Sequence, residues 1–160
     1  MINIVTGKIN SGKTTRMQKL YQANKQGDGI IFIKEMHQNH PKRYQAKRLK
    51  TGEKFEIILR DCYQPENYKT AFQIGPYGFN QSGVDRIETL IKQWLSDDTN
   101  PIFFDEVGIL EVQKEGFYPL IKQLVKSDKT LYISLRENLL DAFLKTFKIT
   151  NYQIVRSSHV

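Results

Sequence analysis

Residues 7–14 of the chain read Gly7-Lys8-Ile9-Asn10-Ser11-Gly12-Lys13-Thr14, a complete GxxxxGK(S/T) pattern. Glycines at these spacings let the backbone curl so that consecutive N–H groups point at one anion, and a helix that starts there adds its positive dipole end. The pattern therefore predicts a phosphate-binding loop, with the N–H groups of residues 10–15 lining it. The predicted nucleotide site consists of Gly7, Lys8, Ile9, Asn10, Ser11, Gly12, Lys13, Thr14 and Thr15.

Two side chains of this loop are candidates for chemistry. The Lys13 ammonium is expected to bridge the β- and γ-phosphates of a nucleotide, and the Thr14 hydroxyl is expected to bind Mg²⁺. An apolar run at residues 2–5 precedes the loop, and a stretch with helical periodicity follows it. Phosphate binding needs this strand–loop–helix context, which disfavours the alternative of a glycine-rich turn with an ordinary helix cap.

Apolar runs and stretches of helical periodicity alternate along the rest of the chain, which predicts an α/β fold. We predict one domain, residues 1–160, with a mostly parallel central sheet covered on both faces and an antiparallel hairpin insertion at about 38–80. Ser82, with Asp85 three residues later, is expected to cap the first helix after the insertion. Strands are expected at 30–33, 102–104, 131–135 and near 153–155, and helices at 82–96, 117–125 and 138–147.

A second polar motif, Asp105-Glu106, directly follows the apolar run at 102–104. Parallel sheets place their ligand crevice at the carboxyl ends of the strands, so this pair should meet the phosphate loop there. Asp105 is the expected carboxylate ligand of Mg²⁺, together with Thr14. Glu106 is then placed to orient and deprotonate an attacking water, the step that hydrolysis requires. A helix cap or an exposed turn is the alternative for such a pair on its own.

Two further charged residues are weaker candidates. Arg136 follows the predicted strand at 131–135 and could stabilise charge on a transferred phosphate as a catalytic cation, with an ion pair to Glu137 or Asp141 as the alternative. Glu111 could act as the base in place of Glu106, and a solvated or Lys114-paired carboxylate is equally consistent with its position. The three histidines lack metal-ligand spacing, so no metal is assigned to them.

The charge of the chain is positive and uneven. Its 24 basic and 17 acidic side chains give +7, and residues 34–60 contribute +5 of this. Such a segment attracts phosphate-rich partners, and nucleic acid is a possible but not favoured one, because a solvated hairpin face has the same composition. No apolar run is long enough for a membrane span and the start does not resemble a signal peptide, so we expect a cytoplasmic protein with no membrane partner.

With the phosphate loop, the run Asp105-Glu106-Val107-Gly108-Ile109-Leu110-Glu111 resembles the small thermophilic-type P-loop nucleoside-triphosphatases, a family that includes the human cancer-related nucleoside-triphosphatase. Members carry a loop of the form GxxGxGKTT, here residues 7–15, and a motif close to DEIGxME, here residues 105–111. This chain departs from the family in having Asn10 where glycine is usual, and Ile109 and Leu110 where Lys and Met are commoner.

The resemblance implies a three-layer, RecA-like fold and slow, Mg²⁺-dependent hydrolysis of ATP, GTP and other nucleoside triphosphates to diphosphate and phosphate, with loose base selectivity. It assigns Lys13 and Thr14 to the family's loop, Asp105 and Glu106 to its acidic pair, and Arg136 to the arginine after its next strand.

The residues are also consistent with two functions other than hydrolysis. One is a small nucleoside or nucleotide kinase with the basic 42–60 hairpin as a phosphate-binding lid, which the water-activating position of Glu106 disfavours. The other is a nucleotide-gated RNA- or DNA-binding module that uses segment 34–60. The sequence predicts no oligomeric state.

Overall fold

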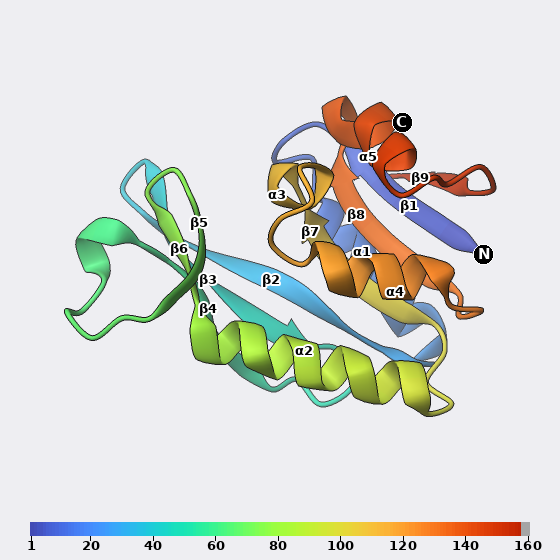
Figure 1. Cartoon of the computed structure of the whole chain (residues 1–160), viewed down its shortest axis with the longest axis horizontal. Helices are drawn as coiled ribbons and strands as arrows, with labels where there is room; N and C mark the ends of the chain where they lie inside the picture. Colours follow the sequence, from blue (N-terminus) through green and yellow to red (C-terminus); the bar gives the residue numbers. More distant parts are fainter. Residues whose placement is uncertain (158–160) are drawn as a thin grey trace.

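Every strand of residues 1–157, the part that the computed structural model describes, joins one sheet in the order β5-β6-β4-β3-β2-β7-β8-β1-β9 (Figure 1). The strands are β1 (Ile2–Gly7), β2 (Asp28–His37), β3 (His40–Arg48), β4 (Lys54–Arg60), β5 (Thr70–Ile74), β6 (Tyr77–Asn80), β7 (Ile102–Val107), β8 (Leu131–Arg136) and β9 (Gln153–Arg156). The helices are α1 (Lys13–Asn24), α2 (Gln81–Ser96), α3 (Ile109–Val112), α4 (Tyr118–Lys126) and α5 (Leu140–Thr146), with 3₁₀ turns at Asp61–Tyr63 and Glu137–Leu139.

The sheet has a parallel half and an antiparallel half. Strands β9, β1, β8, β7 and the first residues of β2 run parallel, which confirms the predicted parallel core. From Ile30 onward β2 pairs antiparallel with β3, and β4, β6 and β5 continue in the same manner. The segment predicted as an insertion, 38–80, therefore extends the central sheet, and in Figure 1 it reaches away from the helices that flank the parallel half.

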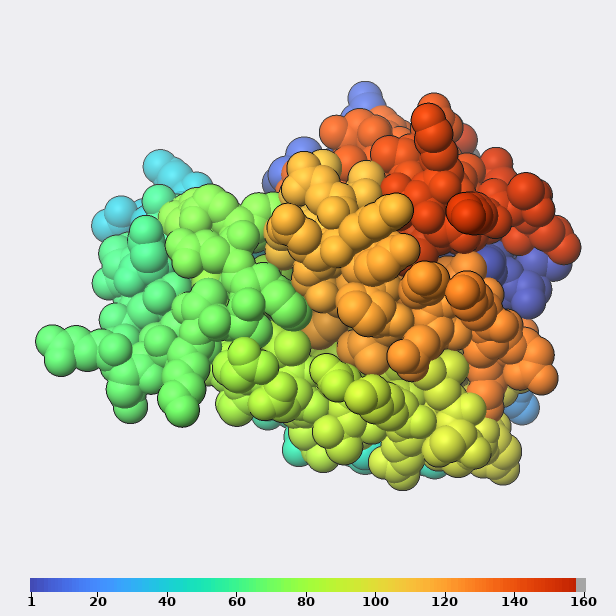
Figure 2. All heavy atoms as spheres, viewed as in Figure 1, coloured from blue at the N-terminus to red at the C-terminus, as the bar shows by residue number. Residues whose placement is uncertain are grey.

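Side-chain alternation along the central strands divides the core into two layers. In β1, β2 and β7, neighbouring apolar residues point to opposite faces of the sheet. One of each pair packs with Met17 of α1, and the other packs on the opposite face, which α2 and α4 cover (Figure 2). The α1 side receives Val5, Ile31 and Phe103, and the other side receives Ile4, Ile30 and Phe104. The three-layer α/β/α arrangement is thus confirmed. Within residues 1–157, no helix is long and apolar enough to cross a bilayer.

Two helix starts differ from the predicted ones. The cap of α2 is Asn80, whose side chain accepts a hydrogen bond from the Gly83 N–H at 3.0 Å, while Ser82 lies inside the helix. Asn80 ends β6 with an extended backbone, the conformation that a capping residue requires. Asn138 lies in a 3₁₀ turn, and α5 begins two residues after it.

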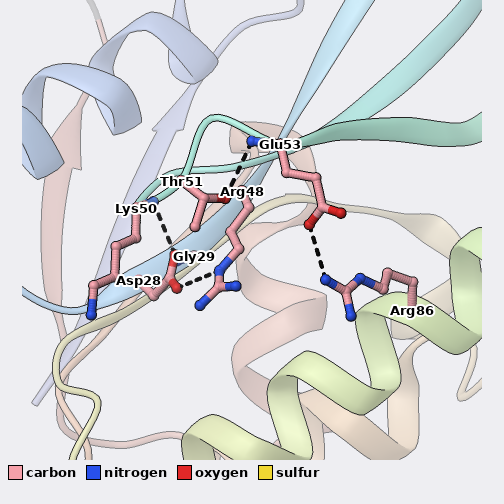
Figure 3. Close-up of polar contacts among 7 residues, drawn as sticks. All are labelled: Asp28, Gly29, Arg48, Lys50, Thr51, Glu53 and Arg86. Carbon is pink, nitrogen blue, oxygen red and sulfur yellow. Dashed lines mark hydrogen bonds and ion pairs between the residues drawn. The ribbon is translucent and has the colours of Figure 1, made fainter.

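A buried ion pair ties the start of β2 to the end of β3 (Figure 3). The Asp28 carboxylate, with 2% of its side chain exposed, accepts hydrogen bonds from Arg48 Nε at 2.7 Å, the Gly29 N–H at 2.8 Å and the Lys50 N–H at 3.1 Å. A second pair, Arg86 with Glu53, links α2 to the same hairpin at 3.0 Å, but its side chains are 43% and 45% exposed. The two pairs therefore differ mainly in burial.

We predict that Arg48→Met lowers the free energy of unfolding by about 3 kcal/mol or more, because it leaves the Asp28 carboxylate buried without its cation. The matched variant Arg86→Met removes an exposed pair and should cost less than about 1 kcal/mol. Urea denaturation followed by circular dichroism measures both values. Equal losses in the two variants would contradict a stabilising role for the buried pair.

Candidate functional site

The predicted phosphate loop connects β1, which ends at Gly7, to α1, which begins at Lys13. Two of its residues have left-handed backbones, Asn10 with a φ of 60° and Gly12 with a φ of 86°. Asparagine tolerates this region better than most residues do, so Asn10 can take the conformation that a glycine would supply. The turn is closed by a hydrogen bond from the Ser11 N–H to the Lys8 carbonyl at 3.1 Å.

The loop and the acidic pair meet at the carboxyl ends of β1 and β7, where the rule for parallel sheets places them. The Thr14 hydroxyl donates to Asp105 Oδ2 at 2.7 Å, across 91 positions of sequence. Lys13 is buried, and its Nζ donates to the Lys8 carbonyl at 3.0 Å. Burial lowers the pKa of the Lys13 ammonium, while the carboxylates of Glu106 and Asp105 act against this shift. The cation and both carboxylates therefore share one crevice.

Asp105 is completely buried and is satisfied by three elements of the fold. Besides Thr14 in α1, the Ser134 hydroxyl in β8 donates to its Oδ1, and the Phe32 N–H in β2 donates to its Oδ2 at 3.1 Å. Burial raises the pKa of the Asp105 carboxyl, and these donors lower it. Adjacent hydroxyl and carboxylate oxygens are ligands that Mg²⁺ accepts alongside phosphate and water, so Thr14 and Asp105 fit a magnesium site.

Glu106 lies at a bulge in β7, which explains how consecutive carboxylates can serve one crevice. In a regular strand, successive side chains point to opposite faces. Here the register of β7 against β8 shifts between Phe104 and Val107, and Glu106 has a φ of 62°, in the left-handed region that non-glycine residues rarely adopt. Ser134 Oγ accepts a hydrogen bond from the Glu106 N–H at 2.8 Å and donates one to Asp105, so the same hydroxyl positions both acidic residues.

The electrostatics of Glu106 follow from this position. Its side chain reaches solvent, but burial of the carboxyl among the crevice walls and the neighbouring Asp105 charge both raise the pKa of Glu106. The cations of Lys13 and Arg136 act in the opposite direction. A carboxylate with a raised pKa is a stronger proton acceptor than an ordinary glutamate, which suits a general base.

Two cations flank the crevice. Arg136 ends β8 in register with Gly7 of the loop, and within residues 1–157 it forms neither of the ion pairs considered for it, with Glu137 or Asp141. Lys34 is the second cation, and its Nζ donates a hydrogen bond to Asn10 Oδ1 of the loop at 2.8 Å. The sequence indicated Lys34 only as part of the basic segment 34–60. Lys34 directly follows the buried apolar residues of β2, and this position is the feature of the sequence that indicates a place near the phosphate loop.

Glu111 has a structural place that neither of the weighed alternatives described. It is buried, and its two carboxylate oxygens accept the N–H groups of Gly108 at 2.8 Å and Phe117 at 3.0 Å. The alternative of a solvated or Lys114-paired carboxylate, which the sequence left equally open beside a catalytic one, is therefore wrong. Burial raises the pKa of Glu111, and the two backbone donors lower it. Glu111 fastens the segment between β7 and α4.

Two of the eight basic side chains in segment 34–60 form ion pairs within residues 1–157. Arg43 pairs with Glu35 at 3.1 Å and with Glu56 at 3.3 Å, and Arg48 pairs with the buried Asp28. Glu35 and Glu56 are already counted in the segment's net charge of +5, so among these partners only Asp28 lowers the field that the segment presents to a phosphate backbone. The geometry therefore gives no added support to a nucleic-acid interface on this hairpin.

Comparison with known proteins gives the same family that the two motifs resemble. A family model described as NTPase matches residues 3–158. Nucleoside-triphosphatases THEP1 from Thermotoga maritima and from Thermotoga sp. strain RQ2 are each 24% identical to this chain over 152 residues, which cover 95% of this chain and 83% of each relative.

Two solved structures share the fold. The crystal structure of THEP1 from the hyperthermophile Aquifex aeolicus superposes with a TM-score of 0.67 at 18% identity, covering 99% of this chain and 90% of that one. The solution structure of a human cancer-related nucleoside triphosphatase gives 0.61 at 10% identity, covering 98% and 87%. Because the family model spans nearly the whole sequence, the chain belongs to the NTPase family.

Proposed function

We propose that this NTPase hydrolyses nucleoside triphosphates to diphosphate and phosphate with Mg²⁺ as the cofactor. The observation that carries the proposal is the hydrogen bond from Thr14 to Asp105, because it joins the phosphate loop to the acidic pair in one crevice. Family membership supports the same reaction. Phosphate release from ATP, GTP, CTP and UTP, each with Mg²⁺ or with EDTA, tests it directly.

Each residue of the crevice has a role in this reaction. The loop amides hold the phosphates, and Lys13 bridges the β- and γ-phosphates. Thr14 and Asp105 would hold Mg²⁺, which when bound neutralises phosphate charge. Glu106 accepts a proton from water as the water oxygen bonds to the γ-phosphorus and the bond to the β–γ bridging oxygen breaks. Arg136 stabilises the charge that develops on the transferred group.

Loose base selectivity agrees with what the crevice offers. The groups that the loop and the acidic pair present are backbone amides, a lysine, a hydroxyl and carboxylates, all placed for phosphates and metal. The phosphates and the metal are the same in every nucleoside triphosphate, so the binding energy that comes from them does not distinguish one base from another. We therefore expect rates with the four common nucleotides to differ by less than about tenfold, because a tenfold difference would need about 1.4 kcal/mol from base contacts.

Removal of the proposed base should separate binding from turnover. Glu106→Gln keeps the size of the side chain but cannot accept the water proton, so we expect nucleotide affinity to persist and turnover to fall by about 10²-fold or more. Fluorescent-nucleotide titration and phosphate release measure the two quantities. Glu115→Gln, at an exposed position beyond α3, is the matched control and should behave as the parent protein does. Unchanged phosphate release from Glu106→Gln would reject this base.

Removal of the loop lysine should instead weaken binding. A hydrogen bond to a charged group contributes roughly 1.5–3 kcal/mol, so Lys13→Ala is expected to raise the dissociation constant of Mg·ATP by about tenfold to a hundredfold. The same fluorescence titration measures this, with Lys19→Ala on the exposed face of α1 as control. Equal affinities for the two variants would show that Lys13 does not contact the phosphates.

Ser134 should act as a positioning residue through Asp105 and Glu106. Ser134→Ala removes one hydrogen-bond donor to Asp105, the proposed metal ligand. Loss of such a partner typically lowers metal affinity 10- to 100-fold, so we expect the half-maximal rate to require about tenfold more Mg²⁺. A magnesium titration of phosphate release is the readout, since a loss of stability alone would not move this midpoint. The control is Ser127→Ala, whose hydroxyl bonds only locally at the end of α4. An unshifted midpoint would remove Ser134 from the site.

A further inference from the structure

A cleft of about 560 Å³ opens beside the crevice, between the antiparallel half of the sheet and the segment that follows β7. Aromatic and aliphatic side chains form most of its wall, among them Phe32, Tyr44, Ile58 and Tyr77. This volume is within the range of pockets that hold small organic ligands. The proposed hydrolysis of a nucleoside triphosphate by water makes no use of such an apolar space.

The cleft lies on the γ-phosphate side of the proposed nucleotide site. Glu106 and Arg136 are part of its lining, whereas no residue of the phosphate loop contributes to it. A nucleotide held by Lys13 through its β- and γ-phosphates would direct its terminal phosphate toward Glu106, and its own base would lie at the opposite end. The cleft is therefore available to a second molecule when the nucleotide is bound.

The walls of the cleft suit a flat ring. Tyr44 and Tyr77 pack edge to face with ring centroids 6.4 Å apart, and the Tyr77 hydroxyl is fixed by donating to the Pro41 carbonyl at 2.9 Å. Burial and the nearby Glu106 charge raise the pKa of Tyr44 to about 12, which keeps its phenol protonated as a hydrogen-bond donor. Rings packed against such side chains gain more than their buried area alone would give.

The charges of the cleft favour a neutral ligand with a hydroxyl group. Arg136 is the one cation among the described residues that line it, and Glu106 lies beside it. Glu111 also contributes to the lining, but both of its oxygens are occupied by backbone amides. An acceptor that carried its own phosphate would need further cations. A hydroxyl next to Glu106, by contrast, would replace the attacking water.

The mouth of the cleft is apolar as well. Ile74, at the end of β5, and Ile109, at the start of α3, line it and are 38% and 37% exposed. Both belong to the small set of large apolar side chains that the described part of the chain leaves open to solvent. Such side chains around a concave site are typical of a ligand-binding surface.

From this arrangement we propose that the cleft binds a nucleoside and presents its primary hydroxyl to the γ-phosphate, so that the protein also transfers phosphate to a nucleoside. The inference rests on the proposed function, because it uses the same nucleotide site and the same base. The hydroxyl oxygen bonds to the γ-phosphorus as the bond to the β–γ bridging oxygen breaks. The hydroxyl proton passes to Glu106 and then to water. The products are a nucleoside diphosphate from the donor and a nucleoside monophosphate from the acceptor.

The test combines the full chain with γ-labelled ATP, Mg²⁺ and each of adenosine, guanosine, cytidine, uridine and thymidine, and separates labelled phosphate from labelled nucleoside monophosphate by chromatography. We expect at least one labelled monophosphate. In Ile74→Trp, whose added ring fills the mouth of the cleft, transfer should fall by about tenfold or more, mainly through the KM for the nucleoside. Phosphate release without nucleoside should stay within about twofold of the parent value.

The matched control is Ile154→Trp, which makes the same change at a 36% exposed isoleucine of β9 outside the cleft and should alter neither reaction. Labelled phosphate without any labelled monophosphate would overturn the inference and leave the hydrolase intact. Transfer that is as fast in Ile74→Trp as in Ile154→Trp would overturn the assignment of the cleft. Absence of both products would instead reject the proposed function itself.

Discussion

The arrangement of the centre of this protein depends on one buried carboxylate, that of Asp105. It accepts hydrogen bonds from Thr14 of α1, from Phe32 of β2 and from Ser134 of β8, three elements that are distant in sequence. A carboxylate removed from water is costly unless its oxygens are satisfied, so each of these elements is held at a fixed distance from β7. The packing of the parallel half and the geometry of the crevice are consequently set by the same group.

The meeting of loop and acidic pair could be predicted because it follows from a general property of parallel sheets, whose strands end at a common edge. Most elements were also readable from periodicity, because buried strands and amphipathic helices leave distinct apolar patterns. The bulge at Glu106 was not readable, since it arises from the register of β7 against β8. The contribution of Ser134 likewise depends on which strand lies next to β7, which no local pattern encodes.

Local polarity was a poor guide where the tertiary fold supplies the partners. Glu111 reads as a surface residue in sequence, yet the chain returns after α3 and brings the Phe117 amide to it. Ser82 and Asn80 are both good capping residues. Asn80 is the cap of α2 because the backbone of β6 is extended up to that residue. Arg48, which looked like part of a surface patch, instead neutralises Asp28 in the interior.

Strand β2 belongs to both halves of the sheet, and this shared membership limits how the molecule can move. Its residues 28–30 pair with β7 and its residues 30–37 pair with β3, and Phe32 in the second part donates its N–H to Asp105. A displacement of β3 relative to β7 would therefore bend β2 close to the residue whose N–H is bonded to Asp105.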